Sequence, residues 1–265
     1  MLNRKFELQK LLAPAVLVIL YVFFSIFGTN FFSTDYLMNI LNASYFIGFM
    51  AIGVTFVIIT GGIDLSLGTT MMCGALLGAT AYSNWGWNIW ASLAFCVFVA
   101  TVIGGINGAL IAYLKLPPFI ATLGMQMIGM GFGAIVTKVV TKRFPTIGTP
   151  DAAFKYVFYK SSNTALIPGF PTGALWLAGA FILAYMLLNH TKFGRYTYAL
   201  GSNYEAARLS GINVKKWQLL IYTFCGFFSG LAGIFYAAVY TSVIPSTGNG
   251  LELLAIAGVV IGKAL

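Results

Sequence analysis

Long uncharged apolar runs recur along this chain and set the strongest limit on its fold. The first extends from Leu11 to Phe32, and others follow at intervals down to the C-terminus. A run of about 20 apolar residues can cross a bilayer as an α-helix, which makes all its backbone hydrogen bonds internally. Together with 59% hydrophobic and only 8% charged residues, these runs predict an all-α membrane protein that crosses the bilayer several times.

The boundaries of the runs predict seven complete spans and the start of an eighth, all in one transmembrane domain covering residues 1–265. The predicted spans are Leu11–Phe32, Met38–Thr60, Leu65–Tyr82, Ala91–Leu114, Phe119–Val136, Gly173–Leu188, Leu219–Tyr240 and Leu251–Leu265. A cleaved signal peptide is the alternative for the first run. A retained span is favoured, because the run is long for a signal peptide and no small-x-small cleavage site follows it.

Basic residues in the loops account for the net charge of +9 and orient the chain. Arg4, Lys5 and Lys10 precede the first run, which predicts a cytoplasmic N-terminus. The basic loop at about 190–217 is also predicted to be cytoplasmic. The loop at about 137–172 is equally basic but falls outside by the span count, and its prolines and aromatics predict an ordered external cap. Without a dense basic tract carrying interleaved aromatics, no binding of nucleic acid is expected.

The cytoplasmic loop contains the pattern of a short helix. Ser202 and Glu205 have the spacing of a capping box, in which two side chains bond to each other's backbone N–H groups. Gly211 suits the left-handed residue that ends many helices. The pattern predicts about two turns of helix from Tyr204 to Ser210. Such a helix either contacts another protein or is merely a solvated part of the loop.

Polar residues near Asp64 interrupt the apolar pattern between the second and third runs. Asp64 follows Gly61 and Gly62 and precedes Ser66. A carboxylate at this place either caps a broken or re-entrant helix or lines a solute path. Both interpretations make these four residues a candidate site.

Three further polar residues lie in the later runs and are candidates for the same path. Asn107 and Gln126 suit a hydroxyl-rich solute, although hydrogen bonding between helices explains each of them at least as well. Glu252 is expected at the outer start of the last run, where a place at the lip fits as well as a place in the path.

Glycines four residues apart, such as Gly104 with Gly108 and Gly226 with Gly230, predict closely packed helices. No catalytic or metal-binding pattern is recognisable. His190 is the single histidine, and Cys73, Cys96 and Cys225 are predicted to be packing residues because they lie in apolar runs without CxxC spacing. The stretch Gly258–Lys263 is one residue short of a phosphate-binding loop and lacks its Ser or Thr. No catalytic residue, metal or cofactor is therefore expected on this chain.

Four separated blocks carry a more specific signal. They are Ile59–Gly68, Pro118–Gly124, Thr191–Asn213 and Gly248–Ala257. In this order they resemble the permease subunits of bacterial ABC importers for simple sugars, the ribose and galactose type. These belong to a larger group that includes branched-chain amino acid permeases. The third block is the most distinctive of the four.

The resemblance implies the transmembrane domain of an ATP-driven importer for a monosaccharide such as ribose, galactose or xylose. In such permeases a cytoplasmic helix docks on a separate ATPase subunit, which binds the ATP and Mg²⁺. The residues carried over to this coupling helix are Asn203, Glu205, Ala206, Ala207, Arg208, Leu209 and Gly211. The other implied partners are a second permease copy, membrane lipid and an extracytoplasmic sugar-binding protein, and the implied location is the bacterial inner membrane.

Permeases of this group have about ten spans, each of about 20 residues, so the resemblance also predicts that this chain is truncated at its C-terminus. Two other classes stay open. An ion-coupled secondary transporter would need charged residues in the membrane, of which chiefly Asp64 is available. A non-transporting scaffold or defective truncated subunit would share the cytoplasmic helix. The sequence identifies neither the sugar nor the partner copy, which is identical or paralogous.

Overall fold

The computed structural model describes residues 8–28, 31 and 33–264, and this part of the chain is mostly helical. The long helices are α1 (Leu8–Phe27), α2 (Thr34–Ile59), α3 (Leu67–Ser83), α4 (Ile89–Ala112), α5 (Pro118–Thr137), α7 (Thr172–His190), α10 (Val214–Tyr240) and α11 (Leu251–Ala264). Shorter elements are β1 (Lys142–Arg143), η1 (Pro150–Ala152), α6 (Ala153–Phe158), α8 (Lys192–Ser202), α9 (Tyr204–Leu209) and β2 (Ser242–Val243).

Helix starts follow from local sequence. The Ser33 side chain accepts a hydrogen bond from Tyr36 N at the start of α2, and Asn88 Oδ1 accepts one from Ala91 N at the start of α4. Both satisfy N–H groups that have no partner inside the helix. Pro118 is the first residue of α5, where its missing N–H costs nothing.

Five described helices are long and apolar enough to cross a membrane: α2, α4, α5, α7 and α10. The multi-pass, all-α architecture is therefore confirmed. Helix α3 has 17 residues, and the apolar parts of α1 and α11, Ala15–Phe27 and Leu251–Gly262, are shorter still. A helix occupies each of the eight predicted runs, but the number of eight spans stays a prediction.

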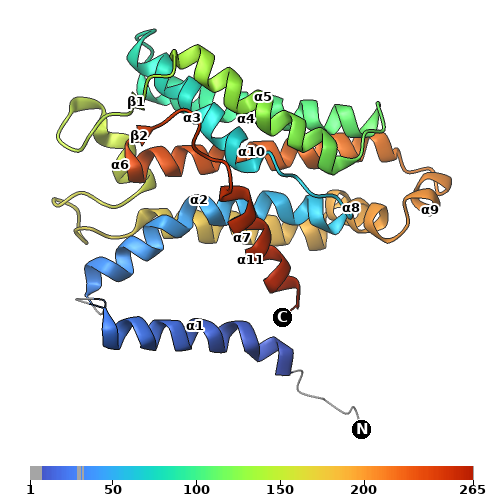
Figure 1. The fold of residues 1–265 in the computed structure, drawn as a ribbon, viewed down its shortest axis with the longest axis horizontal. Helices are drawn as coiled ribbons and strands as arrows, with labels where there is room; N and C mark the ends of the chain where they lie inside the picture. Colours follow the sequence, from blue (N-terminus) through green and yellow to red (C-terminus); the bar gives the residue numbers. More distant parts are fainter. Residues whose placement is uncertain (1–7, 29–30, 32, 265) are drawn as a thin grey trace.

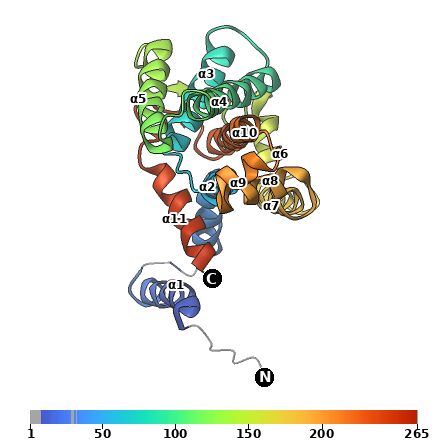
Figure 2. The same cartoon turned by 90° about the vertical axis from the view of Figure 1, so that its right-hand side faces the viewer.

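Helix α10 lies at the centre of the bundle (Figure 2), packed against α2, α3 and α4. It meets α4 at backbone distance, because a Cβ added to Gly104 would lie 2.7 Å from the Gly226 Cα. It meets α2 through the stacked rings of Phe49 and Phe235, whose centroids are 4.3 Å apart. Since lipid is as apolar as these helix faces, close van der Waals packing is what stabilises the bundle, and the glycine spacing is confirmed at this crossing.

The predicted external cap is ordered. Figure 1 shows β1, β2 and α6 gathered at one end of the bundle, with α8 and α9 at the other. Strands β1 and β2 pair antiparallel, with Lys142 opposite Val243. The buried Lys155 of α6 donates hydrogen bonds to the Ala238 carbonyl, at 3.1 Å, and to the Thr241 hydroxyl. Its ammonium thereby satisfies a free carbonyl at the negative end of α10 and joins the cap to that helix.

Two irregular segments run back into the bundle from opposite ends. Residues 60–66 connect α2 to α3, and residues 244–250 connect β2 to α11; Figure 1 shows α11 starting near the middle of the bundle and inclined to the long helices. The second segment meets the first turn of α3, just after the first segment, at Gly248 and Gly68, where each glycine lacks room for a Cβ against the other's backbone. Gly248 also has a φ of +103°, which favours glycine. Non-helical backbone inside a membrane bundle requires such internal partners.

Candidate functional site

The break between α2 and α3 is held by side chains. The Asp64 carboxylate accepts hydrogen bonds from Ser66 N at 2.9 Å and Ser66 Oγ at 2.7 Å. Leu65 N donates to Thr122 Oγ1 of α5 at 3.1 Å. Asp64 is 2% exposed. The carboxylate therefore satisfies backbone at the beginning of α3, as a cap does, and forms a buried Asx turn.

Asn107 of α4 joins this cluster from the opposite side. Its Nδ2 donates to Ser66 Oγ at 2.8 Å, so the chain of hydrogen bonds runs from Asp64 through Ser66 to Asn107. Ser66 and Asn107 are both fully buried. Among the described residues, Asn107 Oδ1 has no hydrogen-bond partner. The cluster thus holds a free acceptor at the centre of the bundle.

A second cluster forms around Glu252 at the start of α11. Gln126 Nε2 donates to Glu252 Oε1 and to Asn249 Oδ1, both at 3.0 Å. Gly250 N donates to the same Glu252 oxygen at 2.9 Å. Glu252 is 3% exposed, and no partner of its Oε2 is present in the described part of the chain. That oxygen lies near Gly68 in the first turn of α3, where the helix dipole is positive.

The position of Glu252 corrects the expectation that it lies at the outer start of the last run. Its partner Gln126 is eight residues into α5, about 12 Å from the beginning of that helix at 1.5 Å per residue. The segment before α11 therefore carries Glu252 into the bundle and not along its rim. The lip position is wrong, because the chain folds inward before the helix begins.

The candidate path residues are brought together, with one exception. Asp64, Ser66, Asn107, Gln126 and Glu252 line the junction of the two irregular segments, which we call the polar core. Gly62 is buried beside it, since a Cβ there would meet the hydroxyl of Tyr222 at 2.5 Å. Gly61 is exposed, and its φ of +77° makes the turn that ends α2.

Sequence reasoning missed three polar residues that lie beside the polar core. Thr122 and Asn249 stand inside two of the sequence blocks but read as ordinary polar positions. Tyr222 is a tyrosine in an apolar run, and its hydroxyl is buried with no described partner. What distinguishes these residues is contact with segments far away in the chain, and the pattern of a single sequence does not reveal such contacts.

Helix α9 lies at the other end of the bundle from the external cap, and its start corrects the capping-box expectation. Asn203 is the N-cap, and its Oδ1 accepts from Ala206 N at 2.9 Å. Ser202 instead ends α8. Glu205 turns toward Arg208 and forms an ion pair at 2.7 Å. Asparagine caps a helix as well as serine does, so it displaces the predicted box.

The residues of α9 divide into an exposed face and a face that packs against the rest of the protein. Glu205, Ala206 and Arg208 are exposed, and Leu209 is 81% exposed. Ala207 packs inward against Leu200 and Val214, so it is unavailable to a partner, contrary to the expectation drawn from the resemblance. Gly211, with φ +83°, turns the chain toward α10.

A groove of about 680 Å³ runs beside α9. We call it the α9 groove; Tyr204, Glu205 and Arg208 form one wall, and the turn 115–118 with the beginning of α10 forms the other. Val214 also lines the groove, and Lys115 and Lys215 add positive charge. The groove could receive a side chain of another protein between the two walls.

Among the described residues, no group of three His, Cys, Asp or Glu side chains is close enough to hold a metal ion. The three cysteines are buried and unpaired.

A match to a family of proteins identifies the class of membrane protein to which this chain belongs. The family described as branched-chain amino acid transport system / permease component matches residues 36–265, which include the polar core and α9. The chain belongs to this permease family. It shares 39% identity over 250 residues with the ribose import permease protein of Escherichia coli (strain K12), covering 93% of this chain and 74% of that protein.

Other permeases are similar over comparable lengths. The ribose import permease protein of Bacillus subtilis (strain 168) is 36% identical over 255 residues, 96% of this chain and 76% of that protein. The xylose transport system permease protein of Haemophilus influenzae is 30% identical over 312 residues, 97% of this chain and 83% of that protein. No solved structure matches this permease.

Proposed function

We propose that this permease forms the translocation path for a small sugar, a monosaccharide of the ribose, galactose or xylose kind, in an ATP-driven importer. The observation that carries the proposal is the 39% identity to a ribose import permease over 93% of the chain. The polar core supports it, because carboxylate and amide groups are the partners that sugar hydroxyls use. The similarity to several import permeases disfavours the secondary-transporter and scaffold alternatives.

We place the permease in the bacterial inner membrane with its N-terminus in the cytoplasm. The basic residues before α1 and around α8 and α9 support this orientation. The loop 137–172 is then external, at the far end of the bundle from α9. This arrangement puts eight helices across or within the membrane, with α3 and α11 starting at the level of the polar core.

Coupling to ATP takes place through α9 in this proposal. ATP and Mg²⁺ bind to a separate ATPase subunit, whose surface meets Glu205, Ala206, Arg208 and the exposed Leu209. The α9 helix packs on α8 and α10 through Ala207. Because α10 is the central helix, a push on α9 reaches the bundle through packed side chains. A second permease copy completes the path, and an external binding protein delivers the sugar.

A charge-swap pull-down tests the coupling surface. The variant carries Glu205→Lys with Arg208→Glu, which keeps an ion pair within α9 but reverses its pattern toward the partner. The control is Arg195→Glu, a charge reversal at an exposed position of α8. We expect membrane-inserted wild type and control to retain the candidate ATPase and the swap variant to lose it. Equal retention by all three proteins would place the contact elsewhere, and no retention by wild type would contradict the proposed assembly.

A further inference from the structure

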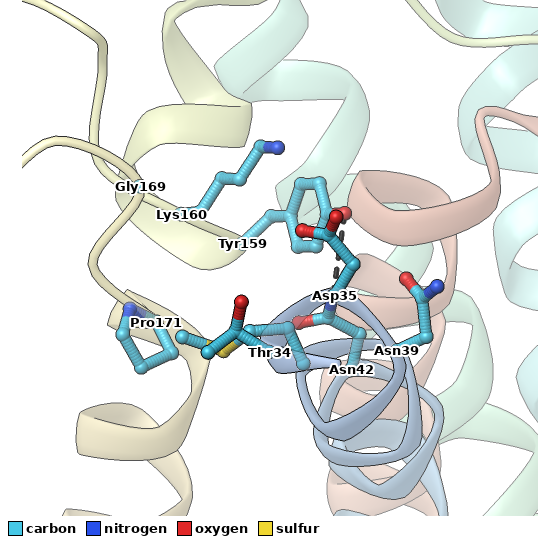
Figure 3. Close-up of a pocket in the computed structure, with 9 residues that line it drawn as sticks. Thr34, Asp35, Asn39, Asn42, Tyr159, Lys160, Gly169 and Pro171 are labelled. Atoms are coloured by element: carbon cyan, nitrogen blue, oxygen red, sulfur yellow. Dashed lines mark hydrogen bonds between the residues drawn. The ribbon is translucent and has the colours of Figure 1, made fainter. Parts of the chain in front are cut away.

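A polar pocket of about 440 Å³ lies at the external end of α2, far from the α9 groove. We call it the α2 pocket. Figure 3 shows the residues that line it: Thr34, Asp35, Asn39 and Asn42 come from α2, and Tyr159 and Lys160 follow α6. Its volume is within the range of about 300–1,000 Å³ that small-ligand sites occupy. The proposed function assigns nothing to this pocket.

The shape of the pocket is fixed by its aromatic wall. Asn42 is buried, and its Nδ2 donates to the Tyr159 hydroxyl at 3.3 Å (Figure 3). The Lys160 ammonium lies 5.4 Å from the centre of the Tyr159 ring, within cation–π range. These contacts place the cation on the side of the pocket opposite to α2.

Two opposite charges line the pocket without pairing. Neither the Asp35 carboxylate nor the Lys160 ammonium makes an ion pair or side-chain hydrogen bond with any described residue. A simple anion would meet the carboxylate, and a simple cation would meet the ammonium. A ligand that carries both charges a few atoms apart satisfies both groups, and the amides of Asn39 and Asn42 add hydrogen-bond donors and acceptors.

Aromatic rings typical of the membrane–water interface lie on the wall of the cap next to the pocket. The rings of Trp90, Phe158 and Trp176 cluster directly beside Tyr159, with centroid distances of 6.4 and 5.7 Å along the row. Trp176 Nε1 donates to the Val157 carbonyl at 3.0 Å. Amphipathic rings of this kind concentrate where the membrane meets water.

Both segments that line the pocket also carry exposed apolar side chains. On α2, Leu37, Met38 and Ile40 are exposed, and on the loop after Lys160, Leu166 and Ile167 are exposed. Leu166 is entirely uncovered, although it is one of the most apolar side chains in that loop. Acyl chains that extend from a headgroup in the pocket would cover these surfaces, whereas a free sugar would leave them bare.

We infer that the α2 pocket binds the headgroup of a phospholipid that carries phosphoethanolamine. Lys160 contacts the phosphate, and Asp35 accepts hydrogen bonds from the primary ammonium. A quaternary choline lacks the N–H groups that Asp35 requires, and a glycerol headgroup lacks the positive charge. Recognition therefore favours the ethanolamine lipid over both. The site is independent of the sugar path.

Lipid retention measured on the intact chain tests this inference. The chain is inserted into nanodiscs with equal amounts of ethanolamine, choline and glycerol phospholipids, then extracted into detergent, and the retained lipid is quantified by mass spectrometry. The variants are Asp35→Asn and Lys160→Gln. The controls are Asp151→Asn and Lys142→Gln, which make the same changes on the external cap outside the pocket.

We expect wild type and controls to enrich the ethanolamine lipid and both pocket variants to retain about tenfold less, the effect of one lost charge-assisted hydrogen bond. Asp35→Asn should leave retention of the glycerol lipid unchanged, which distinguishes headgroup recognition from unfolding. Equal retention of all three lipids, or equal loss in the controls, would overturn the inference. Binding of free ribose that Asp35→Asn abolishes, without a change in lipid retention, would assign the pocket to solute instead.

Discussion

Replacing Gln126 with methionine isolates the link between α5 and α11. Methionine has nearly the same length and volume but no donor, so Gln126→Met removes the two bonds to Glu252 Oε1 and Asn249 Oδ1 while leaving packing almost unchanged. Glu252 keeps its bond from Gly250 N. The substitution therefore tests hydrogen bonding and not the size of the side chain.

The cost follows from the two lost bonds. A hydrogen bond to a charged group contributes about 1.5–3 kcal/mol and a neutral one about 0.5–1.5 kcal/mol in water-soluble proteins. Inside membranes the average falls to about 0.6 kcal/mol per bond. Between these limits we expect a loss of about 2 kcal/mol in the free energy of unfolding, close to a 30-fold change in the equilibrium constant.

The assay is reversible unfolding in mixed micelles at increasing fractions of dodecyl sulfate, followed by far-UV circular dichroism. Gln218→Met is the matched control, because Gln218 makes no side-chain hydrogen bond with the described residues. Asn249→Ala and the double variant complete a cycle, with an expected coupling of about 0.5–1.5 kcal/mol. If Gln126→Met cost no more than the control, the polar core would not be held by this link.

Three further changes give distinct results. Asn203→Ala should cost about 1 kcal/mol and speed amide hydrogen exchange in α9, while Ser202→Ala, which would weaken a capping box, should leave exchange unchanged. Gly226→Val should prevent assembly of the bundle, seen as loss of the monodisperse peak in size-exclusion chromatography, whereas exposed Gly179→Val should not. Burial lowers the pKa of Lys155, so the unfolded chain binds its proton more tightly than the folded cap does. Thermal stability should therefore rise as pH increases toward 10.5, and Lys155→Met, but not half-buried Lys142→Met, should remove that rise.

The helices could be predicted well because apolar periodicity and breakers define them directly. The predicted run Ala91–Leu114 and the observed α4, Ile89–Ala112, differ by two residues at each end. The break at Asp64 was also recognisable, since two glycines precede a buried carboxylate. These features depend on local sequence, which a single chain displays fully.

The remaining features depend on contacts between distant segments. Helix α8 was missed because Gly194 and Gly201 weaken it locally; both lie where the helix backbone presses against α7 and α2. Glu252 was placed at the rim because nothing in its own segment shows that the chain turns inward. Ala207 faces inward for a similar reason, since Leu200 and Val214 cover it from two other helices.

In the proposed function this permease moves a sugar only when an ATPase drives it. We would measure uptake of labelled ribose into vesicles that contain the permease, its candidate ATPase and its candidate binding protein. We expect uptake that requires ATP and that the Glu205→Lys, Arg208→Glu swap abolishes, while Arg195→Glu leaves it intact. Uptake that persists without ATP and follows an ion gradient would contradict the account.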